Sequence, residues 1–310
     1  MSLLRLYTVT RSLRQSFLPK GRLLARSLWR LKSDTVPSPG TKSAGSAAAA
    51  RQSFLSKLSL DGKVTMITGG ARGIGLAIAE ATATLGSDVI LFDVLSPQAG
   101  VEELQKRYGT RIKYYRANVT QQSSLEGSFT TAMEDFGRLD NCITAAGVAL
   151  DKPFLDHQWD EARRVMDVNV LGSFFPAQLA ARQMVSQKSG GNILMIASIA
   201  AHCAVPAQCI SIYGASKAAI TLLGKTLGVE LGPYNIRVNT LSPGFISTDM
   251  LRQFEELQDI FARVPSLGRI GETDDLMLAI AYLLSDGAKY TTGADLPVTG
   301  GLHGGRIALG

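Results

Sequence analysis

A tyrosine and a lysine four residues apart, Tyr213 and Lys217, could carry out proton transfer. In a helix this spacing places both side chains on one face, one turn apart. An ammonium close to a phenol favours the phenolate, so we expect the pKa of Tyr213 to be depressed from its usual value of about 10. A tyrosine tuned in this way exchanges a proton with an alcohol oxygen near neutral pH. Taken alone, the pair could equally be an exposed pair on an ordinary helix.

Ser198 stands upstream of this pair, directly after the apolar run 193–197. That run is typical of a buried strand, so the serine hydroxyl is expected at the carboxyl end of a strand. Ligands bind at this edge in open α/β sheets. The block from Ser198 to Lys217 is therefore the predicted reaction centre.

A glycine-rich turn, residues 68–75, lies between an apolar strand at 63–68 and an alanine-rich helix at 76–85. Such a turn lets the backbone approach a pyrophosphate, and the helix N-terminus supplies N–H donors and a favourable dipole. The next predicted strand ends in Asp93, where a carboxylate would bind the ribose hydroxyls of a dinucleotide. By itself, the turn could also be a tight junction between a strand and a helix.

Further strands and helices alternate along the rest of the chain. Strands are expected at 111–116, 139–145, 191–197, 236–241 and 295–298, and helices at 121–136, 159–186, 213–231 and 274–284. Alternation with continuous apolar strands predicts a parallel sheet covered on both faces. The fold class is therefore α/β, with a single Rossmann-type doubly wound sheet over residues 55–310. Residues 245–270 lack a clear strand and are expected to form a flap over the strand ends.

The charge of the chain is unevenly distributed. Residues 1–51 contain ten Lys or Arg and one acid, which leaves 22 basic and 25 acidic side chains in the rest. The positive net charge of +6 thus belongs to the N-terminal segment and gives no support to nucleic-acid binding by the folded body.

The N-terminal segment 1–33 has no acid, and it mixes arginines and serines with leucines. This composition predicts a mitochondrial transit peptide and a location in the matrix. The alternative is that this segment is a basic tail without a targeting signal and that the protein is cytoplasmic. Its apolar runs are too short for a membrane span. Residues 34–54 are expected to be a disordered linker.

The three cysteines, Cys142, Cys203 and Cys209, are too few for a disulfide framework, and their spacing predicts no metal site. His202 and Cys203 are interpreted as structural residues because neighbours in sequence seldom point at one target.

The motifs occur together in a familiar order. The glycine turn 68–75, the triplet 145–147, Asn169, Ser198, the Tyr213–Lys217 pair and the dipeptide 243–244 follow one another as in the short-chain dehydrogenase/reductase family. The chain resembles this family over about residues 60–300. The resemblance implies a nicotinamide cofactor and a small-molecule substrate.

The resemblance also implies roles for four catalytic residues. Tyr213 would be the acid/base, and Ser198 would hydrogen-bond the substrate carbonyl. Lys217 would lower the pKa of the tyrosine and hold the nicotinamide ribose, and Asn169 would hold a water in a proton relay to Lys217. The cofactor-binding residues that it implies are Gly69, Arg72, Gly73, Ile74, Gly75, Asp93, Asn118, Val119, Ala146, Gly147, Tyr213, Lys217, Pro243, Gly244, Ile246 and Thr248.

Two positions depart from the family pattern. Thr144 replaces the usual asparagine before Ala145, and its hydroxyl is expected to brace the strands in part. Asn118 replaces the usual aspartate after the third strand, and its side-chain carbonyl is expected to accept from the adenine amino group.

Cofactor choice depends on two residues. Asp93 disfavours a 2′-phosphate by charge repulsion, so NAD is the expected cofactor, and Val94 offers no base to reverse this. Arg72 is the counter-evidence because a basic residue there can pair with the phosphate of NADP. The alternative interpretation of Arg72 is a solvated side chain that binds no phosphate.

Within the family, the segments 139–147, 193–217 and 235–250 resemble fungal polyol and sugar dehydrogenases, the D-arabinitol 2-dehydrogenases among them. This implies a sugar alcohol and its ketose as substrates, and relatives are commonly tetramers or dimers. Segments 203–212 and 245–265 are expected to line the substrate pocket. Their apolar residues would also suit a 3-oxoacyl thioester or a polyketide-like ketone. A non-catalytic module that binds a dinucleotide is the alternative from another functional class.

Overall fold

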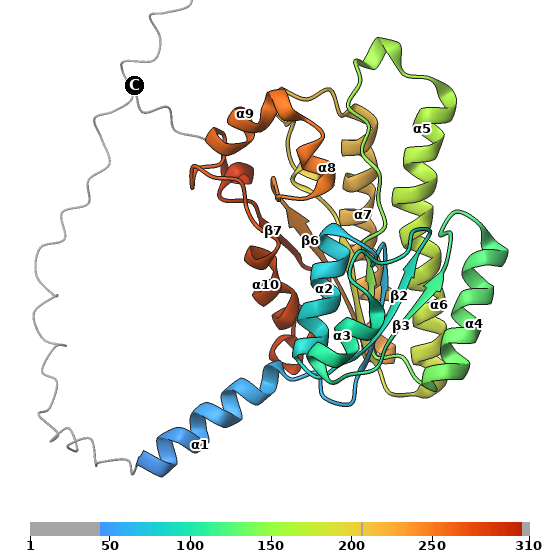
Figure 1. Cartoon of the computed structure of the whole chain (residues 1–310), viewed down its shortest axis with the longest axis vertical. Coiled ribbons are helices and arrows are strands. Elements are labelled where there is room, and N and C mark those ends of the chain that lie inside the picture. Colours follow the sequence, from blue (N-terminus) through green and yellow to red (C-terminus); the bar gives the residue numbers. More distant parts are fainter. Residues whose placement is uncertain (1–43, 206, 306–310) are drawn as a thin grey trace, which may run out of the picture. The chain divides into compact units, whose positions relative to one another are not determined.

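The computed structural model of the chain describes residues 44–205 and 207–305. These residues contain one sheet of seven parallel strands in the order β3-β2-β1-β4-β5-β6-β7. Figure 1 shows β2 beside β3 and β6 beside β7 within it. The strands are β1 Val64–Thr68, β2 Asp88–Asp93, β3 Ile112–Arg116, β4 Asn141–Thr144, β5 Gly191–Ile196, β6 Ile236–Pro243 and β7 Asp295–Val298. The order reverses between β1 and β4, which is where ligands bind in doubly wound sheets. The predicted fold class is confirmed.

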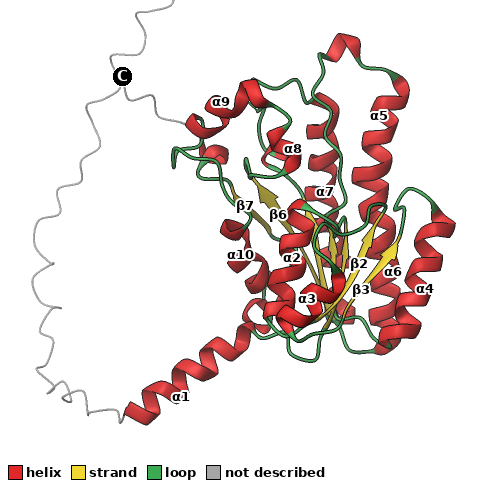
Figure 2. Cartoon of the chain, in the orientation of Figure 1, coloured by secondary structure: helices red, strands yellow, loops and turns green. Residues whose placement is uncertain are grey.

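Helices cover both faces of this sheet (Figure 2). One face packs against α4, α6 and α7, and the other packs against α2, α3 and α10. Their bounds are α2 Gly73–Thr84, α3 Val101–Tyr108, α4 Gln122–Phe136, α6 Gly172–Gln187, α7 Ser211–Glu230 and α10 Asp274–Leu284. Each crossover helix returns the chain to the start of the next parallel strand, so every strand ends at the same edge.

The strands alternate between two apolar cores. In β1, Met66 packs into the core under α4, α6 and α7, whereas Ile67 packs into the core under α2, α3 and α10. Both side chains are fully buried. Truncation of such a residue to alanine costs about 2–5 kcal/mol of stability, and it would loosen the edge that carries the site.

The strand register aligns the carboxyl ends of five strands. Thr68 in β1 pairs with Phe92 in β2 and with Thr144 in β4, and Ile196 in β5 pairs with Leu241 in β6. The residues that follow these strands therefore emerge side by side. This register brings the glycine turn, the 145–147 loop and Ser198 to one edge of the sheet.

Three elements differ from the prediction. Helix α3 was not predicted, although acidic residues in its first turn, basic residues in its last turn and Gly109 in the left-handed conformation all favour it. The single helix expected over 159–186 is divided into α5, Trp159–Met166, a π-helical turn, Asp167–Leu171, and α6. The strand expected to begin at 139 begins at Asn141.

The predicted flap contains two short helices, α8 Asp249–Arg252 and α9 Gln258–Arg263. It has a small apolar core of its own, in which the rings of Phe245 and Phe261 lie 4.3 Å apart. Ile199 and Val205, from the segment after β5, belong to the same core. The flap therefore packs directly on the segment that begins with Ser198.

At the N-terminal side, the predicted transit peptide lies outside the described residues. The chain divides into two units, Met1–Ala49 and Ala50–Gly310. Helix α1 runs over Ala44–Leu55, within the stretch predicted as a disordered linker, and its side chains from residue 47 onward are exposed. A helix without a buried face contributes no core, so the domain begins after it.

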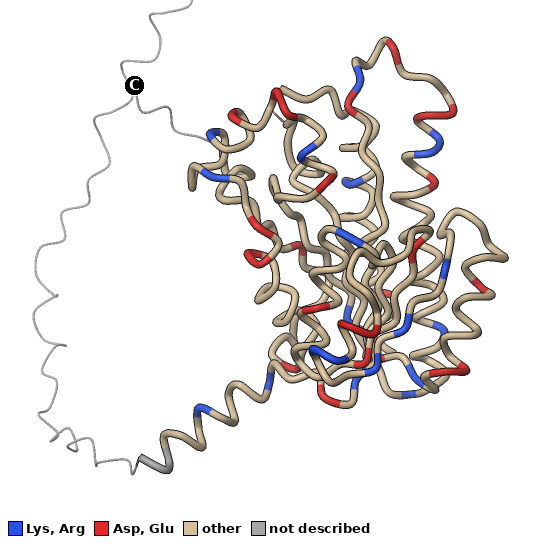
Figure 3. The backbone as a smooth tube through the Cα atoms, in the orientation of Figure 1, with Lys and Arg blue, Asp and Glu red and all other residues tan. Residues whose placement is uncertain are grey.

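Charged residues of both signs are distributed along the part of the chain that the structure describes. Lys and Arg alternate with Asp and Glu along the tube of Figure 3. Among residues 44–205 and 207–305, no helix is long and apolar enough to cross a membrane. The same residues contain no cluster of His, Cys, Asp and Glu with metal-binding geometry.

Candidate active site

Tyr213 and Lys217 lie one turn apart near the start of α7. Lys217 is 6% exposed, and its Nζ donates a 2.9 Å hydrogen bond to the backbone oxygen of Ile196 at the end of β5. The same Nζ lies 5.8 Å from the centroid of the Tyr213 ring. The two side chains therefore share one face of the helix, as their spacing predicted, at the carboxyl edge of the sheet.

The prediction of a depressed tyrosine pKa is wrong for this protein without its ligands. Burial raises the pKa of Tyr213 above its usual value, and the nearby Ser198 hydroxyl offsets this only in part. Burial also lowers the pKa of Lys217 to about 8. The ammonium points at the Ile196 oxygen instead of the phenol, so its charge is not used to stabilise a phenolate. Tyr213 is thus a protonated donor at neutral pH.

Ser198 begins a short 3₁₀ turn over Ile199–Ala201, and its Oγ accepts a hydrogen bond from the Ala200 N–H at 3.2 Å. This turn packs closely on α7 at Gly214, where a Cβ atom would lie 3.0 Å from the Ala200 oxygen. Ser198 itself is 8% exposed. The serine and the tyrosine are therefore carried by two segments in direct contact.

Asn169 lies in the π-helical turn between α5 and α6 and is fully buried. Its Oδ1 accepts from the Val148 N–H at 2.9 Å, and its Nδ2 donates to the Val148 oxygen at 3.0 Å and to Ser216 Oγ at 2.9 Å. Single π-helical turns occur frequently at functional sites because the extra residue re-aims a side chain. The amide braces the loop after β4 against α7, and the predicted water relay to Lys217 stays a prediction.

Ser216 is a residue that the sequence analysis missed. Its hydroxyl accepts from Asn169 and donates to the Tyr213 backbone oxygen at 2.7 Å, and the residue is fully buried. Its position three residues after Tyr213 could have indicated a bond back to the tyrosine carbonyl. Ser216 therefore connects Asn169 to the helical turn that carries the tyrosine.

Gly147 completes the centre of the site. A Cβ atom at this position would lie 3.4 Å from Asn169 Oδ1 and 3.5 Å from Lys217 Nζ. The glycine thus keeps the space beside both polar groups open, next to Ala146.

The glycine turn after β1 is a close backbone cradle. A Cβ atom at Gly75 would lie 2.0 Å from the Gly69 oxygen, and one at Gly69 would lie 2.6 Å from the Ala146 nitrogen. Gly69 and Gly73 have φ values of +68° and +55°, which favour glycine. Helix α2 begins at Gly73 and continues through Ile74, so its first N–H groups face this cradle. These residues fit the pyrophosphate of a dinucleotide.

Asp93 holds the mouth of this cradle. Its Oδ2 accepts from the Ala71 N–H and its Oδ1 accepts from the Leu95 N–H, both at 3.0 Å. The neighbouring Arg72 is exposed at the start of α2. These two backbone hydrogen bonds hold the carboxylate in place beside the cradle.

The flap brings distant predicted residues to the same place. Thr248 lies against the glycine turn, since a Cβ atom at Gly73 would be 3.6 Å from its Cγ2. Ile246 pairs with Gly271 in a short parallel bridge. Pro243 ends β6, and a Cβ atom at Gly244 would lie 2.8 Å from the Thr299 Cα. All four predicted residues of this segment thus lie over the carboxyl edge of the sheet.

Thr144 and Asn118, the two positions that depart from the pattern of the resembled family, have the following contacts. Thr144 Oγ1 is buried without a hydrogen-bond partner among the described residues, so it does not brace the strands. Asn118 Oδ1 accepts from both the N–H and the hydroxyl of Thr120, at 3.0 and 2.8 Å. Both lone pairs of this oxygen are used in these two bonds, and its contact with adenine stays a prediction. Val119 packs on the first turn of α6 at Gly172.

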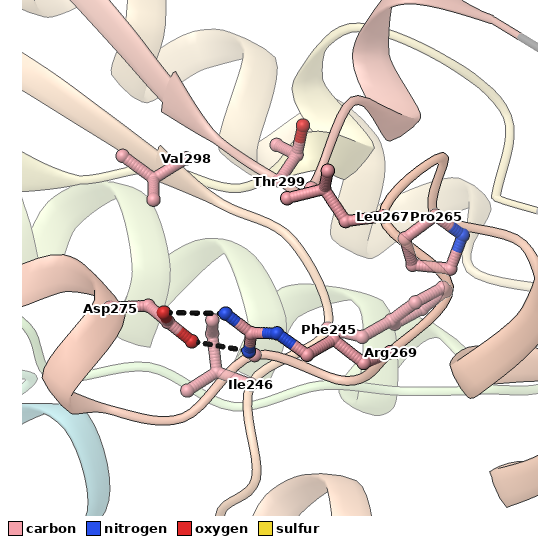
Figure 4. Close-up of a pocket in the computed structure, with 10 residues that line it drawn as sticks. Phe245, Ile246, Pro265, Leu267, Arg269, Asp275, Val298 and Thr299 are labelled. Atoms are coloured by element: carbon pink, nitrogen blue, oxygen red, sulfur yellow. Dashed lines mark hydrogen bonds and ion pairs between the residues drawn. The ribbon is translucent and has the colours of Figure 1, made fainter.

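A cavity of about 130 Å³ opens under the flap. Figure 4 shows apolar side chains around the ion pair between Arg269 and Asp275, whose two N–O distances are both 2.7 Å. Phe245, Ile246 and Pro265 line it, whereas residues 203–205 and 207–212 do not. The four catalytic candidates do not line it either, so the substrate pocket stays a prediction.

Comparisons with known proteins found relatives that match most of the chain. A family model described as Enoyl-(Acyl carrier protein) reductase matches residues 69–303. The chain is 36% identical to a sorbose reductase of Candida albicans over 80% of this chain and 89% of that protein. It is 33% identical to a probable NADP-dependent mannitol dehydrogenase of Yarrowia lipolytica, over 86% and 99%.

A bacterial relative and a solved structure extend this group. The 3-oxoacyl-[acyl-carrier-protein] reductase of Haemophilus influenzae is 34% identical, over 79% of this chain and 99% of that protein. A short-chain dehydrogenase/reductase from Mycobacterium marinum has a TM-score of 0.78 and 35% identity, over 80% of this chain and 98% of that one.

Proposed function

Because the chain belongs to the short-chain dehydrogenase/reductase family, we propose that it interconverts a sugar alcohol and its ketose. The reaction converts a secondary alcohol into a ketone, or the reverse, by hydride transfer. One observation carries the proposal: Ser198, Tyr213 and Lys217 are held together at the carboxyl edge of the sheet, next to a cradle for a dinucleotide. Binding alone does not require a partly buried phenol with a serine beside it.

Each side chain has a task in the proposed reaction. The protonated Tyr213 donates to the ketone oxygen during reduction and receives the proton back during oxidation. Ser198 donates a hydrogen bond to the same oxygen, which stabilises the charge that develops on it. Lys217, whose Nζ lies 5.8 Å from the centroid of the Tyr213 ring, holds the nicotinamide ribose. When bound, the nicotinamide supplies or accepts the hydride.

We propose NAD as the preferred cofactor. The Asp93 carboxylate, fixed by two backbone N–H groups, supports this choice because it repels a 2′-phosphate. Arg72 and the name of the Yarrowia lipolytica relative are the observations that favour NADP. The remaining predicted contacts are the glycine turn, Val119, Ala146, Gly147 and the 243–248 segment.

Turnover by the chain truncated before Leu55 tests the substrate class. We expect NAD-dependent oxidation of one member of a panel of arabinitol, xylitol, sorbitol and mannitol, with NADP measured in parallel. Reduction of an acetoacetyl thioester by NADPH, with no activity on the panel, would instead support an acyl-chain reductase. The Haemophilus influenzae relative is the reason to retain that candidate.

Tyr213→Phe separates an enzyme from a non-catalytic module. We expect turnover to fall by at least about a hundredfold while NADH fluorescence still reports cofactor binding, because only the proton donor is removed. Unchanged turnover in this variant would contradict the assigned role.

For location, we propose the mitochondrial matrix, supported by the acid-free, Arg-rich composition of residues 1–33. A fluorescent fusion of the full chain should enter mitochondria, and a fusion that lacks residues 1–54 should stay in the cytosol. Mitochondrial entry of the shortened fusion would exclude this segment as the signal.

We also propose a homo-oligomer. Large apolar side chains on α7 and around α10 are exposed, among them Leu222, Val229, Leu278 and Tyr290. Burial of such side chains against a second copy would remove them from water. Light scattering of the truncated protein should give the mass of a dimer or a tetramer, whereas a monomer mass would contradict the proposal.

A further inference from the structure

A buried carboxylate connects the end of the sheet to the turn that begins with Ser198. Asp295, the first residue of β7, has a side chain that is 7% exposed. Its Oδ1 accepts from the hydroxyls of Thr240 and Ser242 in β6, the second at 2.9 Å. Its Oδ2 has no directed hydrogen bond among the described residues. A buried carboxylate oxygen needs a polar neighbour, and the His202 imidazole lies beside this one.

His202 reaches this carboxylate from the other segment. Its Nε2 lies 2.8 Å from Asp295 Oδ2 and 3.1 Å from Ser242 Oγ. Because the Ser242 hydroxyl donates its proton to Asp295, its oxygen can only accept from the imidazole. Nε2 is therefore the protonated nitrogen, and its N–H is directed at Ser242 with the carboxylate beside it.

The histidine is rigidly connected to Ser198. The Ala201 N–H donates to the Ser198 backbone oxygen at 3.0 Å, and the His202 N–H donates to the Ile199 oxygen at 2.9 Å. The turn between them packs on α7 at Gly214, one residue after Tyr213. Any rotation of this turn would move Ser198 relative to Tyr213.

We propose that His202 is a positioning residue, which holds Ser198 at the reacting oxygen by anchoring the turn to Asp295 and Ser242. Ser242 directly precedes the predicted cofactor residues Pro243 and Gly244, so this anchor also aligns the serine with the cofactor side of the site. Reactive groups misplaced by about 1 Å can cost about a hundredfold in rate, so a group remote from the chemistry can still control it.

Two substitutions of His202 test the geometry. Glutamine places an amide nitrogen about where Nε2 lies, whereas asparagine is too short to bring its donor to Ser242. We expect His202→Gln to stay within about threefold of the native kcat, and His202→Asn to lose at least about tenfold. His303→Leu, at an exposed histidine that bonds Thr299, is the matched control and should leave kcat unchanged.

The decisive comparison is made in a Ser198→Ala background. If His202 acts through Ser198, His202→Asn should lower kcat by less than about twofold when the serine is already absent. The dissociation constant of NADH and the melting temperature are measured for every variant. An equal loss with and without Ser198 would overturn the proposal and assign His202 a purely structural role.

A second pair of variants, Asp295→Asn with and without Ser198→Ala, keeps the test valid if His202→Asn fails to fold. Asp295→Asn turns an amide donor or a neutral oxygen toward the imidazole, so it should reproduce the loss, again only when Ser198 is present. The inference rests on the proposed reaction, and turnover is measured with the ketose that the native protein reduces fastest. If the native protein reduces none, the proposed substrate fails, and the same cycle is run on the acetoacetyl thioester.

Discussion

The side-chain amide of Asn169 is joined to the backbone of Tyr213 through one hydroxyl, that of Ser216. The Asn169 amide donates to Ser216 Oγ at 2.9 Å, and Ser216 donates to the Tyr213 oxygen at 2.7 Å. Asn169 and Tyr213, two catalytic candidates from different segments, are thereby joined by hydrogen bonds between protein groups alone. Buried networks of this kind rigidify a site when every member is satisfied.

Ser216→Ala should break this connection. The Asn169 amide would lose a partner in a buried place, which costs about 1–3 kcal/mol in the free energy of unfolding. We also expect kcat to fall more than cofactor affinity does, because the helical turn carrying Tyr213 loses its brace. Urea unfolding and steady-state kinetics measure the two effects. Ser211→Ala, at an exposed position on the same helix, is the control, and equal behaviour of the two variants would contradict the role of Ser216.

Lys217→Met should change how stability depends on pH. Burial lowers the pKa of Lys217 to about 8 in the folded protein, whereas a lysine in the unfolded chain keeps a pKa of about 10.4. Between these values the unfolded chain binds more protons, so the free energy of unfolding rises with pH. The penalty of the buried ammonium is complete below pH 8 and is relieved above it, by about 3 kcal/mol at most.

Urea unfolding of the cofactor-free protein between pH 7 and 10 measures this dependence. The rise should be present in the native protein and in Lys225→Met, at an exposed lysine on the same helix, and absent in Lys217→Met. Parallel pH curves for all three proteins would show that the Lys217 ammonium is not buried at a cost.

Asp93→Ser should relax the choice of cofactor. Removal of the carboxylate relieves repulsion of a 2′-phosphate, which is worth on the order of 1–4 kcal/mol for charges a few ångströms apart near a protein surface. We therefore expect the ratio of kcat/KM for NADP over NAD to rise at least about tenfold. Asp88→Ser, at the opposite end of the same strand, should leave the ratio unchanged. A native enzyme that already prefers NADP would assign the selection to Arg72.

Gly75→Ala should abolish dinucleotide binding. Its Cβ atom would lie 2.0 Å from the Gly69 oxygen, so the cradle must open. Gly127→Ala is the matched control because a Cβ atom there meets nothing within 4 Å in α4. This control should raise the free energy of unfolding by about 1 kcal/mol through helix propensity. Quenching of tryptophan fluorescence by NADH measures binding, and native-like affinity of Gly75→Ala would contradict the cradle.

The sequence by itself determined the succession of the strands and most of the helices along the chain. It also determined the glycine cradle and the shared helical face of Tyr213 and Lys217. These features depend on local periodicity, on glycine spacing and on the carboxyl edge common to parallel strands, all of which a linear pattern records. Helix α3 was missed because it has only eight residues, most of them polar, so it contributes little apolar content to a sequence pattern.

Only the tertiary structure decided which polar groups bond to one another and which of them are buried. Burial, which depends on distant packing, raised the pKa of Tyr213 where sequence proximity to Lys217 predicted the reverse. The π-helical turn that aims Asn169 at Ser216 exists because two helices and a loop meet there. The contact between His202 and Asp295 joins residues 93 positions apart, and no local pattern links them because β6 and β7 bring them together only in the fold.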